Sequence, residues 1–130
     1  MIDVNDLTVS NLCFELLDYI ENYGDYKVET RLLNEDGEHV YCDELDIYHE
    51  GFNCLHIEPH VCGTSETNQY TLKEFYSLLE SISESSRRNA EKYVVLEQSD
   101  TICGWYYANA YVEFEVEKDK NTFIIKGMKY

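Results

Sequence analysis

Apolar residues recur at helical spacing in two stretches of the chain. The first helix is expected over about Thr8–Asn22, with an apolar stripe formed by Val9, Leu12, Cys13, Leu16, Leu17 and Ile20. The second helix is expected to begin after Thr71, which stands three residues before Glu74 as in a capping box. Its stripe is formed by Leu72, Phe75, Tyr76, Leu79 and Ile82. Three serines indicate that this helix frays through Ser83–Arg88.

Elsewhere the apolar residues alternate with polar ones, which is typical of strands. Strands are expected over Tyr26–Leu33, Phe52–Glu58, Tyr93–Glu97, Ile102–Glu117 and Thr122–Met128. One more strand is expected in two segments, Glu38–Cys42 and Leu45–His49, interrupted at Asp43-Glu44. Asp36-Gly37 predicts a hairpin turn after the first of these, and Pro59–Tyr70 is read as a polar connection. Ile102–Glu117 is long for one strand, so a bend is expected at Gly104 or at Ala108-Asn109.

The element order α-β-β-β-α-β-β-β predicts an α+β fold, in which two helices pack on antiparallel sheet. Residues 1–130 are expected to form a single domain, since a chain of 130 residues with 44% hydrophobic residues can build one core. The two halves can also be read as a repeated αβββ unit, although no residue-level repeat accompanies that order.

Charge separates the two halves more sharply than the hydrophobic pattern does. The formal net charge is -16. Residues 1–70 hold 16 Asp and Glu against Lys27 and Arg31, whereas residues 71–130 hold 10 acids against 8 bases. The first half is therefore acidic and the second nearly neutral. Such a surface repels nucleic acid and anionic membranes and attracts basic proteins, so neither direct nucleic-acid binding nor membrane binding is expected.

The five cysteines form an odd set without a CxxC pair, and no signal peptide or membrane span is visible. Free thiols in a reducing cytoplasm are therefore expected.

The densest acidic stretch lies between positions 35 and 50 and contains no Lys or Arg. On a strand, side chains at i and i+2 share a face about 6.5–7 Å apart, similar to the step between neighbouring phosphates. One hypothesis is therefore a nucleic-acid mimic, and the alternatives are a solvated face that keeps the protein soluble or a cation site. The candidate partner-binding residues are Glu35, Asp36, Glu38, Tyr41, Asp43, Glu44, Asp46, Tyr48 and Glu50.

Glu113, Glu115 and Glu117 form a second acidic ladder. Folding the chain back at a Lys118–Asn121 turn places Lys126 opposite Glu113 as a cross-strand pair. This ladder is therefore expected to be neutralised within the fold.

Metal binding is a further hypothesis for the segment His49–Cys62. The candidate zinc ligands are Cys54, His56, His60 and Cys62, if Pro59 turns the last two back towards the first two. Their spacing matches no standard zinc finger, and free Cys and His side chains are the alternative. Asn34, Asp36 and Glu38 are alternate oxygen ligands, but the twelve-residue calcium loop is absent. No cofactor is expected.

No arrangement typical of an enzyme stands out. Cys62 with His60 or His56 forms a possible thiol–imidazole pair, but no Gly-rich elbow or phosphate-binding loop accompanies it. Arg87, Arg88 and Lys92 make one small basic spot. We therefore expect a binding protein without catalytic residues.

The stretch from Leu7-Thr8-Val9-Ser10 to Glu58, including Asn34-Glu35-Asp36-Gly37-Glu38, resembles small proteins carried by phages and mobile elements of Gram-positive bacteria. That resemblance implies an anti-defence protein of the anti-CRISPR or anti-restriction type, acting in the cytoplasm of the bacterial host on a basic groove of a nuclease. The alternatives are an immunity protein against a basic toxin and a small metal- or nucleotide-binding protein. A homodimer through an unpaired edge at Trp105–Tyr111 is also possible.

Overall fold

The computed structural model describes residues 2–33, 39–42, 44–50, 53–60, 69–100, 105–108 and 111–128. Its helices are α1 (Val9–Tyr23), α2 (Leu72–Ser85) and α3 (Arg87–Ala90), with short 3-10 turns at Val4–Asp6 and Lys118–Lys120. Its strands are β1 (Ile2–Asp3), β2 (Lys27–Leu33), β3 (His39–Cys42), β4 (Glu44–Glu50), β5 (Cys54–His60), β6 (Tyr93–Asp100), β7 (Trp105–Ala108), β8 (Tyr111–Glu117) and β9 (Thr122–Met128). The α+β class expected from the sequence is confirmed.

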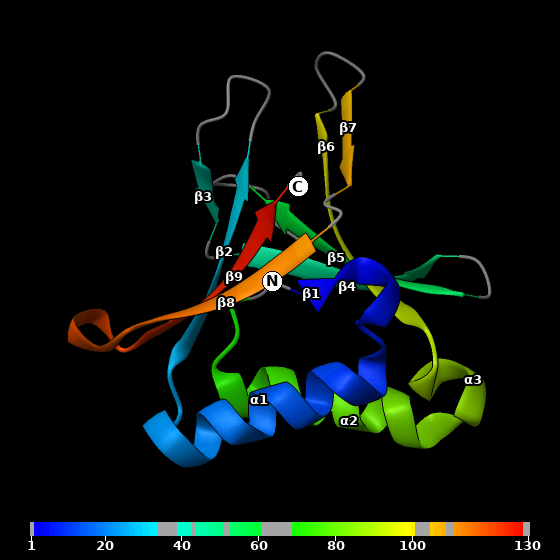
Figure 1. The fold of residues 1–130 in the computed structure, drawn as a ribbon, viewed down its shortest axis with the longest axis horizontal. Coiled ribbons are helices and arrows are strands. Elements are labelled where there is room, and N and C mark those ends of the chain that lie inside the picture. The colour runs from blue at the N-terminus through cyan, green and yellow to red at the C-terminus, as the bar shows by residue number, and fades with distance from the viewer. Residues whose placement is uncertain are drawn as a thin grey trace.

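The strands form two sheets that share the helices α1 and α2 beneath them (Figure 1). Sheet A has the order β1-β8-β9-β2-β3, and sheet B has the order β4-β5-β6-β7. Most neighbours are antiparallel, as expected, but β2 runs parallel to β9 and β5 runs parallel to β6. These two parallel contacts join strands from opposite halves of the chain. No described helix has the length and apolar character needed to cross a membrane.

The expected strand Ile102–Glu117 is wrong as a single element. Its described residues belong to β7, which pairs with β6 in sheet B, and to β8, which pairs with β1 and β9 in sheet A. Alternation of apolar and polar residues continues on both sides of the break, so periodicity alone could not reveal the change of sheet. The connection expected to start at Pro59 also begins later, because β5 continues to His60.

With that break, and because the segments β3 and β4 belong to different sheets, four main strands rather than three follow each long helix. Unit 1 is α1 with β2–β5, and unit 2 is α2 with β6–β9. In each unit the first antiparallel pair joins one sheet and the second pair joins the other sheet. The parallel contacts then lie between β2 and β9 and between β6 and β5, which are equivalent places in the two units. The chain thus consists of two units with the same element order, and each unit contributes one pair of strands to each sheet.

The contacts at the starts of the helices repeat in the same way. The amide of Val94 donates to the carbonyl of Leu7 at 2.8 Å, and Val9 donates to Lys92 at 2.9 Å. Equivalent bonds run from Val28 to Tyr70 at 2.9 Å and from Leu72 to Tyr26 at 2.7 Å. Each helix therefore begins against the first strand of the other unit.

Both helices start at a threonine cap, as the sequence predicts. The hydroxyl of Thr8 accepts from the amide of Asn11, and that of Thr71 accepts from Glu74 in a complete capping box. The expected fraying of the second helix is replaced by an end at Ser85 and a new short helix, α3, capped by Ser86.

One hydrophobic core fills the space between the helices and both sheets. Its buried side chains occupy equivalent places in the two units: Val9 and Leu72, Leu12 and Phe75, Leu16 and Leu79, Val28 and Val94, Leu45 and Val112, Leu55 and Phe123, Ile57 and Ile125. Equivalent positions of the two units are therefore both buried, although most of them carry different residue types. Leu17, placed on the apolar stripe by its spacing, is 37% exposed.

Candidate functional site

The structure places part of the predicted acidic site on one strand at the edge of sheet B. Glu44, Asp46, Tyr48 and Glu50 occupy alternate positions of β4, whose intervening residue Leu45 is buried in the core. Tyr41 belongs to β3, in the other sheet. The remaining predicted residues Glu35, Asp36, Glu38 and Asp43 lie outside the described residues, as do the calcium candidates Asn34, Asp36 and Glu38.

The register of sheet B extends the acidic positions of β4 onto the neighbouring strands. Asp46 is directly opposite Glu58 of β5. In β6, Glu97 follows Leu96, which lies opposite Ile57. None of the residues of β4, β5, β6 and β7 is Lys or Arg. We call the positions Glu44, Asp46, Glu50, Glu58 and Glu97, on the face of sheet B opposite the core, the acidic face.

The equivalent row of sheet A has the opposite composition at its centre. Glu113 of β8 is opposite Lys126 of β9, as expected from the sequence, and Lys126 is opposite Arg31 of β2. The repeat aligns Asp46 with Glu113, Glu58 with Lys126 and Glu97 with Arg31. A row of one acid and two bases in sheet A thus corresponds to three acids in sheet B.

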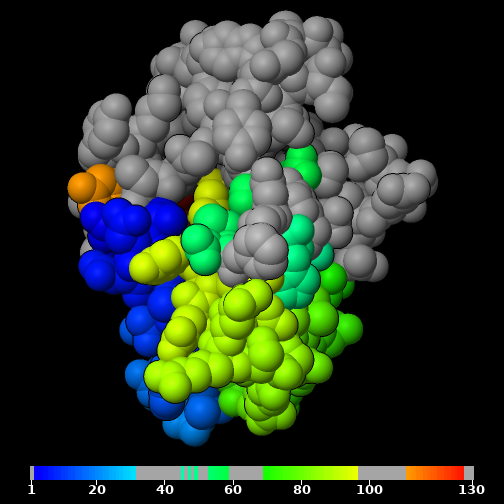
Figure 2. All heavy atoms as spheres, turned by 90° about the vertical axis from the view of Figure 1, so that its right-hand side faces the viewer, coloured from blue at the N-terminus to red at the C-terminus, as the bar shows by residue number. Residues whose placement is uncertain are grey.

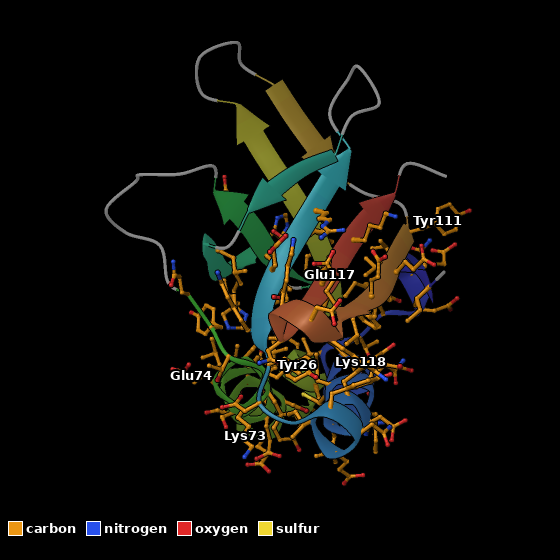
Figure 3. All side chains as sticks on the ribbon, turned by 90° about the vertical axis from the view of Figure 1, so that its left-hand side faces the viewer. Tyr26, Lys73, Glu74, Tyr111, Glu117 and Lys118 are labelled. Carbon is orange, nitrogen blue, oxygen red and sulfur yellow. The ribbon has the colours of Figure 1, made fainter. Side chains whose placement is uncertain are left out.

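Arg31 neutralises the rest of the acidic ladder in sheet A. Its guanidinium lies 2.5 Å from Glu117, 3.7 Å from Glu115 and 3.5 Å from Glu29, and its side chain is 13% exposed. Figure 3 shows Glu117 at the end of β8. The hydrogen bond from Arg31 holds the pKa of Glu117 below its ordinary value. The sequence indicated that this ladder is neutralised, but it did not identify Arg31, because β2 meets β9 only in the tertiary fold.

The His and Cys residues proposed for zinc are distributed along β5 instead of being gathered by a turn. Cys54, His56 and His60 are all residues of this strand, so Cys54 and His60 are about 20 Å apart along it. The expected turn at Pro59 is therefore wrong. Within the described residues, no group of three or more His, Cys, Asp or Glu side chains is arranged to hold a metal ion. Cys62 lies outside them.

His49, at the start of the segment proposed for metal binding, lies beside Lys92. Nζ of Lys92 lies 2.8 Å from Nδ1 of His49. An ammonium has no acceptor, so Lys92 donates to an unprotonated ring nitrogen. Burial and the charge of Lys92 lower the pKa of His49. Lys92, the partner of His49 in this contact, is only 6% exposed.

A small groove between α1 and α2 is lined in part by Cys13, Phe14, Tyr76 and Glu80. Burial and the nearby Glu80 raise the pKa of the Cys13 thiol to about 11. The hydrogen bond to Glu80, at 2.5 Å, raises the pKa of Tyr76 to about 12. Both groups are protonated at neutral pH, so Cys13 is a poor nucleophile.

A scan against protein-family models found no matching family, and searches of curated proteins and of solved structures found no significant match. The resemblance drawn from residues 7–58 therefore stays a prediction.

Proposed function

We propose that the chain is a non-enzymatic inhibitor that uses its acidic face to bind a basic, nucleic-acid-binding groove of another protein. The observation that carries the proposal is the difference between the two sheets. At the positions where sheet A has Lys126 and Arg31, sheet B has Glu58 and Glu97. The same backbone arrangement therefore carries one acid and two bases in sheet A and three acids in sheet B.

Like charges directly opposite each other destabilise a sheet, by an amount of the order of 0.2–1 kcal/mol for one pair. The Asp46–Glu58 pair is such a juxtaposition. A basic partner would place positive charge beside both residues on binding. The alternate residues of β4 stand about 6.5–7 Å apart, which is close to the phosphate spacing that a nucleic-acid groove recognises. The acidic face is thus suited to take the place of a nucleic-acid backbone.

The partner class follows from the same chemistry. A protein with a net charge of -16 approaches a basic groove faster than it approaches other surfaces, over a Debye length of about 8–10 Å. A nuclease of bacterial defence, acted on by a mobile-element inhibitor, is the partner that the sequence resemblance implies. A toxin nuclease would offer a similar basic surface, and identification of the partner distinguishes the two.

The test begins with a pull-down from lysate of the bacterial host, with the recovered proteins identified by mass spectrometry. Binding of the recovered partner is then measured at low and at high salt, alone and with its nucleic acid as competitor. We expect affinity to fall steeply with salt, because exposed charges are screened, and we expect the nucleic acid to displace the protein. If the affinity is the same at low and high salt and the nucleic acid does not displace the protein, the proposal is overturned.

Charge variants locate the contact. The double variant Glu44→Gln with Asp46→Asn should weaken binding about tenfold, since each lost charge contact contributes on the order of 1 kcal/mol. The matched control is Glu15→Gln with Asp18→Asn, which removes two charges from the exposed side of α1. An equal loss in both variants would show that total charge, and not the acidic face, determines binding.

A further inference from the structure

The largest deviation from the internal repeat lies between the second long helix and its first strand. In unit 1 the connection from α1 to β2 is a short turn at Gly24, whose φ of 99° favours glycine. In unit 2 the corresponding connection contains the extra helix α3. Since both connections join equivalent elements, α3 is not needed to link them.

This insertion builds a groove in the face shown in Figure 2, where α3 lies near the N-terminal segment. The groove has a volume of about 640 Å³ and is lined by Thr8, Asn53, Arg87, Arg88, Glu91, Lys92 and Tyr93. Three of these residues are basic and one is acidic, in a chain whose net charge is -16. Positive charge is therefore concentrated at the element that departs from the repeat.

Lys92 differs from the other two basic residues of the groove because it is buried. It is 6% exposed, and its ammonium donates to the ring of His49, an acceptor that brings no negative charge. The acidic residue of the groove, Glu91, is bound by Arg87 at 3.1 Å. A buried cation is costly unless an anion is near it. Among the described residues that line the groove, the one acid is already paired with Arg87, so a negatively charged ligand would supply an anion beside Lys92.

We propose that this groove binds a small phosphorylated molecule of the mononucleotide class. Lys92, Arg87 and Arg88 would hold the phosphate, for which Lys and Arg are the usual ligands in proteins. Tyr93, which is 41% exposed and lines the same groove, offers an aromatic surface to an attached ring. The groove volume lies within the range of small-ligand sites, about 300–1,000 Å³. The site is separate from the acidic face and does not depend on the proposed inhibition.

Calorimetric titration of the intact protein with inorganic phosphate, a nucleoside and the corresponding nucleoside monophosphate tests the proposal. We expect the monophosphate to bind, the nucleoside alone not to bind, and affinity to fall with salt. Tighter binding of the monophosphate than of phosphate would support the role of Tyr93, and Tyr93→Leu should abolish that difference. Equal affinity for the monophosphate and for phosphate would overturn the mononucleotide class, because the ring of the ligand would then make no contact with Tyr93. Absence of binding by both phosphates at millimolar concentration overturns the proposal.

Two variants place the ligand in the groove. Lys92→Met should weaken binding about tenfold, as expected for loss of one charge-assisted hydrogen bond. Because Lys92 is buried, Arg87→Gln with Arg88→Gln provides a second variant at exposed positions, checked by thermal melting. The matched control is Lys73→Met, an exposed lysine on α2 that should leave binding unchanged. Loss of binding in the control, or full binding in both groove variants, contradicts this placement.

Discussion

At the residue scale, equivalent positions in the two units show which side chains the fold requires. Leu16 in α1 and Leu79 in α2 are both fully buried in the shared core, whereas Leu17 is 37% exposed. The two neighbouring leucines look alike in the hydrophobic pattern. The difference between them arises from packing, because the sheets cover only one side of the helix.

Leu16→Ala should lower the free energy of unfolding by about 2–5 kcal/mol, since it leaves a cavity in the core. Leu17→Ala should change it by less than about 1 kcal/mol. Urea unfolding of both variants, compared at equal m-values, measures the difference. Equal effects would contradict the packing described for α1.

Arg31 is the residue whose removal should change the response of the protein to acid. Its hydrogen bond lowers the folded-state pKa of Glu117, so the stabilisation is present above the unfolded-state pKa and is lost as pH falls through the folded one. Arg31→Met should therefore be less stable than the unchanged protein at pH 7. The difference in unfolding free energy between Arg31→Met and the unchanged protein should decrease as the pH falls from about 5 to about 3.

Chemical unfolding at a series of pH values measures this gap. Arg87→Met is the matched control, because Arg87 pairs with Glu91 at an exposed site, where an ion pair contributes about 0–1 kcal/mol. If Arg31→Met lowers the free energy of unfolding by the same amount at every pH, the guanidinium of Arg31 does not lower the pKa of Glu117.

At the element scale, the helices were predicted more closely than the strands. Thr8 and Thr71 cap their helices through bonds to amides three residues away, so the signal is contained in one short segment. A strand's partners are set elsewhere in the chain. The acidity of β4 is visible in the sequence, yet its position opposite Glu58, and the contrast with sheet A, require the register.

Asp46→Lys should give sheet B a cross-strand pair of opposite charges, as sheet A has. It places an opposite charge across from Glu58, as Glu113 stands across from Lys126. We expect the free energy of unfolding to rise by about 0.2–1 kcal/mol, while affinity for a basic partner falls. Thermal or urea unfolding provides the first measurement and the binding assay the second. A less stable variant would mean that repulsion between Asp46 and Glu58 does not destabilise the protein.

At the scale of the whole molecule, the two units cannot form separate cores. β2 needs β9 and β6 needs β5, and each helix begins against a strand of the other unit. Unfolding should therefore be a single cooperative transition. The single domain expected from the sequence stays a prediction, which the number of unfolding transitions would test.

Residues 1–68 and 69–130, produced separately, should each lack cooperative structure, because each loses the parallel neighbour of its central strands and half of the core. Mixing the two fragments should restore the spectrum of the intact protein. Circular dichroism with thermal melting makes both measurements. A fragment that melts cooperatively on its own would contradict the strand exchange between units.

The sequence by itself determined the features carried by neighbouring residues: two capped amphipathic helices, alternating strands, the α+β class and the acidity of the first half. These depend on spacing within one segment, so they can be read without the rest of the chain. The tertiary structure decided the division of Ile102–Glu117 between two sheets, the parallel contacts, the pairing of Arg31 with distant glutamates and the groove at α3. Each of these depends on which distant strands meet, and strand pairing is selected by the packing of a shared core, which no single segment encodes.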